Sequence, residues 1–218
     1  MIRKIPCLCD NSFEAEVPAE IDLDINKEYL DEIQNGSFLS FTCPGCGKKH
    51  KPEFPITVFW PSKNLKFEVL PEPDREEFYR RKKRPARTPA ETVIGYPELA
   101  DRLAVIRDGF DPVPVEALKY FLQLKVEEDY PEREIEIWYF GTNVSGEPSS
   151  MGTNSTGEPS SLEFHIHGIR ENEVAVIKVP LPVYQKTLDD YTKNPKKEIF
   201  ISLRVRTYLS VKNTTRTL

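Results

Sequence analysis

The sequence has 218 residues, of which 30 are Lys or Arg and 35 are Asp or Glu, so its formal net charge is −5. This acidic balance argues against a general nucleic-acid-binding protein, because such proteins bind through domains of net positive charge. No stretch approaches the roughly 18 consecutive apolar residues of a membrane-spanning helix, and the first residues lack an apolar run of signal-peptide length. We therefore expect a cytoplasmic protein without membrane association, built from one large domain or two small ones.

The chain has four cysteines, which form two close pairs. The first pair lies in the sequence Cys-Leu-Cys and the second in Cys-Pro-Gly-Cys-Gly. Four cysteines are too few for a disulfide framework in a chain of this length, whereas a C-x-x-C turn brings two thiolates to one ion. Structural zinc takes four such ligands in a tetrahedron, with Zn–S bonds of about 2.3 Å. The spacing predicts one structural Zn²⁺ per chain. Its four predicted ligands are Cys7, Cys9, Cys43 and Cys46.

The first pair is the less regular of the two. Residues i and i+2 of an extended strand lie roughly 6.5 Å apart, whereas two sulfurs on one zinc lie roughly 3.8 Å apart. Cys7 and Cys9 must therefore lie in a bend if both bind the ion, and the flanking Pro6 and Asp10-Asn11-Ser12 favour one. The alternatives are an inert pair of buried thiols, a Cys7–Cys9 disulfide, or a site in which His50 is the substitute ligand for one cysteine. If His50 does not bind metal, we expect it in a solvated loop.

Short strands around one helix are expected in the first seventy residues. Alternating apolar residues predict strands at 13–17, 21–25, 38–42, 54–60 and 65–70, with a helix at 27–34 between Asn26 and Asn35-Gly36. One predicted strand leads directly into Cys43. Residues 1–71 are therefore expected to form a zinc-ribbon-like, β-rich module, with a strand and a helix inserted between the cysteine pairs.

Four stretches of this sequence resemble a known family. They are Glu-Ile-Gln-Asn-Gly-Ser-Phe-Leu-Ser-Phe-Thr-Cys-Pro-Gly-Cys-Gly (32–47), Pro-Ile-Thr-Val (55–58), Gly-Tyr-Pro-Glu-Leu (95–99) and Ile-Arg-Asp-Gly-Phe-Asp (106–111). They resemble the CpXC domain family of bacteria and archaea, which is named for two Cys-Pro-x-Cys motifs, over about residues 1–126. The resemblance implies that Cys43 and Cys46 are the second family pair and that Cys7 and Cys9 occupy the place of the first. The chain departs from the family there, because Cys-Leu-Cys is one residue short and lacks the proline. The resemblance implies no particular activity.

Residues 72–92 have the composition of a linker, being rich in proline and carrying the basic run Arg80-Arg81-Lys82-Lys83-Arg84. Such a run is typical of a nucleic-acid patch, a patch for another anionic partner, or a nuclear-import signal. Acidic residues lie immediately upstream, however, at Glu72, Asp74 and Glu76-Glu77. This charge balance favours a solvated tether.

Residues 93–218 are expected to form a second module. Leu99 and Leu103 have helical spacing after Pro97, and Asp108-Gly109 would end that helix. A second helix is expected from Pro114, so that the two form a helical hairpin. The remaining pattern predicts strands at 133–140, 162–170, 172–179 and 198–211 and a helix at 182–193. The predicted class is α+β, with a C-terminal antiparallel sheet and one helix.

Two features of the second module have no assigned role. Residues 141–150 recur with two changes at 152–161. Two copies are too few for a solenoid, so we expect a hairpin loop, with a specific binding loop as the alternative. His165 and His167 would point to the same face of a strand. They are either two ligands of a second metal, an acid–base pair, or ordinary surface histidines, and the absence of a third ligand at motif spacing favours the last.

The motifs favour a binding function over catalysis. The sequence has no phosphate-binding glycine loop, no G-x-S-x-G turn and no His-Glu-x-x-His helix, and a closed four-ligand zinc site leaves no coordination position for substrate. We therefore hypothesise that the protein is not an enzyme but a zinc-stabilised adaptor whose C-terminal sheet binds a protein partner. One alternative is a zinc-thiolate redox sensor, because the cysteine spacing is similar to that of the oxidation-activated bacterial holdase chaperone. The other is a nucleic-acid-binding zinc ribbon, which the net charge disfavours.

Overall fold

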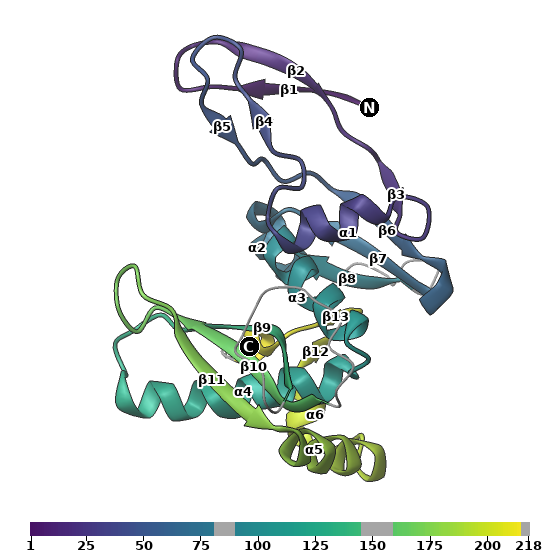
Figure 1. Ribbon diagram of the computed structural model, residues 1–218, viewed down its shortest axis with the longest axis vertical. Helices are drawn as coiled ribbons and strands as arrows, with labels where there is room; N and C mark the ends of the chain where they lie inside the picture. The colour runs from purple at the N-terminus through teal and green to yellow at the C-terminus, as the bar shows by residue number, and fades with distance from the viewer. Residues whose placement is uncertain (81–89, 145–158, 215–218) are drawn as a thin grey trace. The chain divides into compact units, whose positions relative to one another are not determined.

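The computed structural model describes residues 1–80, 90–144 and 159–214, and it is of the α+β class (Figure 1). Most of the basic run, most of the tandem repeat and the last four residues lie outside this described part. The chain divides into two compact units. Unit 1 comprises Met1–Leu103 and Arg206–Tyr208, and unit 2 comprises Ala104–Val205 and Leu209–Leu218.

Two antiparallel hairpins carry the cysteines in unit 1. Strand β1 (Ile2–Pro6) pairs with β2 (Ser12–Glu16), and β4 (Phe41–Thr42) pairs with β5 (Lys49–His50). Between them in the chain lie β3 (Glu20–Asp22) and α1 (Lys27–Gln34). This is the predicted organisation of two cysteine-bearing elements with a strand and a helix inserted between them (Figure 1).

The main sheet of unit 1 is mixed, and its strands run in the order β13-β8-β7-β6-β3. Strand β6 (Ile56–Trp60) is antiparallel to β7 (Leu65–Leu70) and parallel to β3, while β8 (Glu91–Ile94) lies parallel to β7 and to β13 (Tyr208–Leu209). Side chains that alternate along β6 and β7 are fully buried, among them Val58, Phe67 and Val69. Because β8 pairs with β7, residues 93–103 belong to unit 1, and the division between units falls within α3 (Tyr96–Arg107).

Residues 72–80, the first part of the expected linker, are folded. A 3₁₀ turn (Glu72–Asp74) leads into α2 (Arg75–Arg80), and Arg75 is buried. Its guanidinium donates to the Tyr208 hydroxyl at 2.6 Å, to the Ile94 carbonyl at 3.1 Å and to Glu98 at 2.6 Å. Composition indicated a tether because it does not show that Arg75 also bonds to Tyr208, which lies 133 positions away in the sequence.

Unit 2 is built on an antiparallel sheet of order β11-β10-β9. Its strands are β9 (Glu136–Val144), β10 (Pro159–His167) and β11 (Ala175–Pro180), and its longer helices are α4 (Pro112–Asp129) and α5 (Leu181–Lys193). One face of the sheet contributes Leu162, Phe164 and Ile166 to a core that also contains Leu118 of α4 and Tyr184 of α5. The C-terminal antiparallel sheet was therefore predicted correctly.

The predicted strand at 198–211 is wrong. The structure has α6 (Glu198–Ser202), β12 (Arg204–Val205), β13 and a 3₁₀ turn (Val211–Asn213) in its place. Phe200 and Leu203 are three residues apart, as on one face of a helix, and both are buried with Ala117. Ile201 is 57% exposed. Packing against α4 thus favours a helical turn over the apolar alternation of this segment.

At the junction between α3 and α4, the predicted helix end at Asp108-Gly109 is confirmed. Gly109 has φ of +82° after the end of α3, and its N–H donates to the Ile106 carbonyl. Helix α4 begins at Pro112 rather than at the predicted Pro114, because Asp111 accepts a hydrogen bond from the Val113 N–H at 2.8 Å and caps the helix. Within the described residues, no helix is both long enough and apolar enough to cross a membrane.

Candidate metal centre

Each cysteine pair lies in the turn of its hairpin. In the first hairpin the Cys7 N–H donates to the Asn11 carbonyl at 2.9 Å, and Asp10 adopts the left-handed conformation with φ of +62°. The chain therefore bends at Cys-Leu-Cys, as a shared ion requires. In the second hairpin the Cys43 N–H donates to the Lys48 carbonyl at 2.9 Å, and Gly47 has φ of +74°. Glycine suits this position because other residues adopt positive φ at a cost.

The two turns bring the four sulfurs together. Cys7, Cys9, Cys43 and Cys46, here called the cysteine cluster, have Sγ atoms that all lie within 4.8 Å of one another. The shortest distances join the hairpins, at 3.6 Å between Cys7 and Cys46 and 3.8 Å between Cys9 and Cys43. These values match the separation of roughly 3.8 Å between two sulfurs on a tetrahedral zinc. All four cysteines are free thiols. The arrangement could hold one metal ion.

Two polar side chains contact the cluster from outside. The Asn11 amide lies 3.9 Å from the Cys43 sulfur, and His50 Nε2 lies 3.1 Å from the Cys7 sulfur. The Asn11 amide donates to the Cys43 sulfur, and His50 can donate to a Cys7 thiolate when its Nε2 carries the proton, as groups around metal ligands commonly do. His50 is held in place by edge-on packing against Phe13, with 6.0 Å between ring centroids. The sequence offered His50 as a possible substitute ligand but favoured a solvated loop for it. The structure instead places it on β5, against the Cys7 sulfur.

The cluster contains one thiol that ionises readily and one that resists ionisation. Burial raises the pKa of Cys43, but backbone N–H groups of Gly45 and Cys46 and the thiols of Cys7 and Cys9 outweigh it and lower the pKa to about 6. The Cys9 N–H lowers the pKa of Cys7, but burial and hydrogen bonds with the neighbouring thiols raise it to about 12. Four thiolates in one space repel one another, so full ionisation requires a cation between them.

Asn11 was not identified from the sequence as part of the site. Its carboxamide oxygen accepts from the Ser12 N–H at 2.9 Å, which fixes the turn. A Cβ atom at Gly45 would lie 2.8 Å from the Asn11 amide, so a larger residue at that position would displace this amide. An Asn two residues after Cys9 is a common turn signal, but the sequence cannot show that its amide faces the other hairpin.

The two histidines of unit 2 do not converge with a third potential ligand among the described residues. His165 and His167 both lie on β10, where the His165 ring is 3.3 Å from Glu163 and stacks on Phe140, and His167 is exposed. Among residues 1–80, 90–144 and 159–214, the cysteine cluster is the group of three or more potential ligands that converges on one point.

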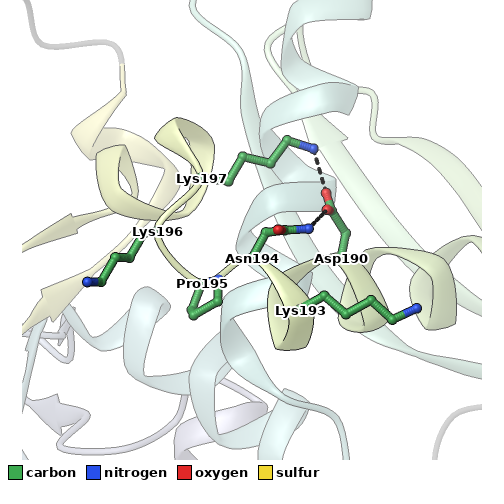
Figure 2. Close-up of a pocket in the computed structure, with 6 residues that line it drawn as sticks. All are labelled: Asp190, Lys193, Asn194, Pro195, Lys196 and Lys197. Atoms are coloured by element: carbon green, nitrogen blue, oxygen red, sulfur yellow. Dashed lines mark hydrogen bonds and ion pairs between the residues drawn. The ribbon is translucent and has the colours of Figure 1, made fainter.

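Unit 2 also has a shallow hollow at the end of α5, with a volume of about 580 Å³ (Figure 2). Its lining residues are Asp190, Lys193, Asn194, Pro195, Lys196 and Lys197. Asp190 accepts from Lys197 at 2.6 Å and from Asn194 at 3.1 Å, and the Lys197 hydrogen bond lowers its pKa. Figure 2 shows Lys193 and Lys196 pointing away from each other, so these lysines do not converge on a ligand.

The fold and the site define an α+β protein in which two hairpins bring four cysteines together as a potential metal centre. The family model described as CpXC protein matches residues 5–119. The chain therefore belongs to the CpXC family, as the resemblance of its motifs implied. A protein of Treponema pallidum (strain Nichols), described as an uncharacterized protein, is 30% identical over 233 residues, covering 97% of this chain and 98% of the relative. No solved structure matches the chain.

Proposed function

We propose that this protein is a non-catalytic binding protein, an adaptor, whose N-terminal hairpins are held together by one structural zinc ion. The observation that carries the proposal is the convergence of four sulfurs from two hairpins at tetrahedral spacing. Four thiolates are a donor set that zinc prefers, and such closed sites are structural. The ion would join residues that lie more than thirty positions apart in a unit whose hairpins have short strands.

A closed site favours binding over catalysis for a chemical reason. With four cysteine ligands in place, zinc has no open position at which to activate water or to polarise a substrate. Hydrogen bonds from His50 and Asn11 would further reduce the nucleophilicity of the thiolates. The exposed Leu8, between two ligands at the tip of the first hairpin, is 86% accessible and suits a contact with a protein partner.

The ligand set can be tested by cobalt spectroscopy. Co²⁺ bound to four thiolates gives intense visible bands, and replacing one thiolate by imidazole or water shifts these bands. We expect the wild type to bind one Co²⁺ with a four-sulfur spectrum, which Zn²⁺ then displaces. Cys46→Ser is expected to bind Co²⁺ weakly with three sulfurs. Cys7→Ser is expected to retain a three-sulfur, one-nitrogen spectrum that disappears in Cys7→Ser/His50→Ala. A wild-type spectrum without thiolate bands would refute the proposal.

A zinc-thiolate redox sensor is the second candidate, and the two short cross-hairpin distances favour it. Oxidation by hydrogen peroxide would join Cys7 to Cys46 and Cys9 to Cys43. Each pair of thiolates gives two electrons to one peroxide molecule, so that one S–S bond forms, the O–O bond breaks and two hydroxide ions leave. Zinc would be released, since disulfide sulfurs are poor ligands.

Peroxide should therefore be added to the zinc-loaded protein while a chromogenic chelator reports release of zinc. Rapid release that a thiol reductant reverses would support the sensor, and retention of zinc would support the structural role.

A further inference from the structure

The sheet of unit 2 has a second face, opposite its core. Because Leu162, Phe164 and Ile166 point into the core, the alternate residues Glu163 and His165 of β10 point to the other face. That face also bears Phe140, which is 45% exposed, and Val176, which is 51% exposed and lies across from His165 on β11. It is therefore a surface of aromatic and apolar side chains that also carries the Glu163 carboxylate and, across from it on β11, Lys178.

A β-bulge opens a space beside that carboxylate. Glu163 pairs with Gly141, but the next residue, Phe164, pairs with Tyr139, so Phe140 is an extra residue in β9. A Cβ atom at Gly141 would meet no atom of the described residues within 4 Å. Because side chains of paired residues lie about 5 Å apart, a group placed over Gly141 would be within reach of Glu163.

Glu163 is buried, and its contacts with the described polar side chains are long. Its side chain is 9% exposed, and Lys178 Nζ lies 4.0 Å away on a half-exposed side chain. Within the described residues, its carboxylate also contacts His165 Nε2 at 3.3 Å and the Asn143 amide at 3.4 Å. All three distances exceed the roughly 2.7–2.9 Å of charge-assisted hydrogen bonds. A buried carboxylate is costly unless it is well paired, so this position favours an additional cationic donor.

The neighbouring aromatic ring suits one kind of cation. Phe140 stacks on His165 with 3.9 Å between centroids and 15° between ring planes, and much of Phe140 stays exposed beside the space over Gly141. A guanidinium is planar, stacks on aromatic rings and donates two parallel hydrogen bonds to a carboxylate, whereas an ammonium does neither as well. A phosphate in the same place would be repelled by Glu163.

We propose that this site, formed by Phe140, Gly141, Glu163 and His165, binds an arginine side chain presented by a protein partner. The guanidinium lies over Gly141, stacks on Phe140 and pairs with Glu163. The inference rests on the proposed binding function and specifies the chemistry of the partner. It lies in unit 2 and does not involve the cysteine cluster.

The test is an NMR titration of the full, zinc-loaded chain with a capped tripeptide, Gly-Arg-Gly. The matched probes are Gly-Lys-Gly and Gly-citrulline-Gly, in which a neutral urea replaces the guanidinium. We expect the arginine peptide to shift the resonances of Phe140, Gly141, Glu163 and His165 with at least fivefold tighter apparent binding than either control. Glu163→Gln should weaken binding about tenfold. Gly141→Val should abolish it while leaving core resonances unchanged, because its side chain fills an open space.

Equal shifts from the arginine and citrulline peptides, or unchanged arginine binding in both variants, would overturn the inference. Shifts of the same residues by an oligothymidylate, without an arginine effect, would also overturn it, because aromatic side chains on a sheet can stack with bases. Repeating the titration after chelation separates the two proposals. Arginine binding should persist after chelation, because the site lies in unit 2. A chain that binds arginine but takes up no zinc would contradict only the zinc site, and a zinc-loaded chain without arginine binding would contradict only this site.

Discussion

Gly109 and Gly141 form a matched pair in unit 2, because a Cβ atom at either position would meet no atom within 4 Å in the part of the chain that the structure describes. They differ in backbone conformation, since φ of Gly109 is +82°. We expect Gly109→Val to lower the free energy of unfolding by about 1–2 kcal/mol, because a branched residue is strained at positive φ. Gly141→Val should change it by less than about 0.5 kcal/mol. Urea unfolding measures both, and equal effects would contradict the assignment of Gly109 as a helix terminus.

The lowered pKa of Cys43 gives the metal centre a pH dependence. The ordinary pKa of 9.0 falls to about 6 in the folded protein. A group with a lowered folded pKa contributes stability above its unfolded pKa, and this contribution is lost as the pH falls through the folded value. Zinc lowers the pKa further, so we expect release of zinc below about pH 6. Dialysis of the zinc-loaded protein between pH 8 and pH 4, followed by metal analysis, checks this. Complete release above pH 7 would contradict it.

At the residue scale, spacing was sufficient to identify the cysteines but not their surroundings. Two close pairs predict convergence, because turn geometry is local. The contacts of His50 with Cys7 and of Asn11 with Cys43 depend on how one hairpin lies against the other. The same holds for Glu163, which occupies a polar position in an alternating strand and has no sequence signal for its burial.

Among the elements, α2 depends most on a single side chain. Arg75 joins it to Glu98 and Tyr208, and hydrogen bonding to Glu72 with the charge of Glu98 raises the arginine pKa despite burial. Arg75→Leu removes the cation from a Glu98 side chain that is 11% exposed, so we expect a loss of about 3–5 kcal/mol. Tyr208→Phe removes only the hydroxyl and should cost about 1–3 kcal/mol. Trp60 fluorescence during urea unfolding measures both, and a neutral Arg75→Leu would contradict this account.

The elements that could be predicted are those with local signals. The helix at Lys27–Gln34 and the strand at Leu65–Leu70 have the predicted bounds, because turn residues flank the helix and apolar alternation marks the strand. Strand β1 was missed because its sequence lacks a clear alternation of apolar and polar residues. Its first apolar residue, Ile2, is exposed in the structure. Residues 198–211 were mistaken for a strand because the burial of Phe200 and Leu203 against α4 determines their conformation.

For the whole molecule, metal binding should stabilise one unit and not the other. Unit 1 contains the cysteine cluster and Trp60, and unit 2 contains Trp138, the second of two tryptophans in the chain. Single-tryptophan variants, Trp60→Phe and Trp138→Phe, therefore report each unit separately. We expect a chelator to lower the unfolding temperature followed through Trp60 and to leave that of Trp138 unchanged. Equal shifts at both tryptophans would show that the units unfold together.

The division of the molecule could not be located from composition. The proline-rich segment indicated a boundary between residues 1–71 and 93–218, but Arg75 reaches Tyr208 across 133 positions and β8 pairs with β7. Pairings over such distances have no local signal. Independent folding of residues 1–71 and 93–218 remains a prediction, which limited proteolysis and isolated fragments of the chain would test.

Metal content tests the central claim most directly. The protein should be purified without added metal or chelator and analysed by native mass spectrometry, alongside Cys43→Ser. The account predicts one zinc per chain in the wild type, slow reaction of the four thiols until a chelator is added, and little or no zinc in the variant. Wild-type protein without metal, with four freely titrating thiols and an unfolding temperature that a chelator does not change, would contradict it.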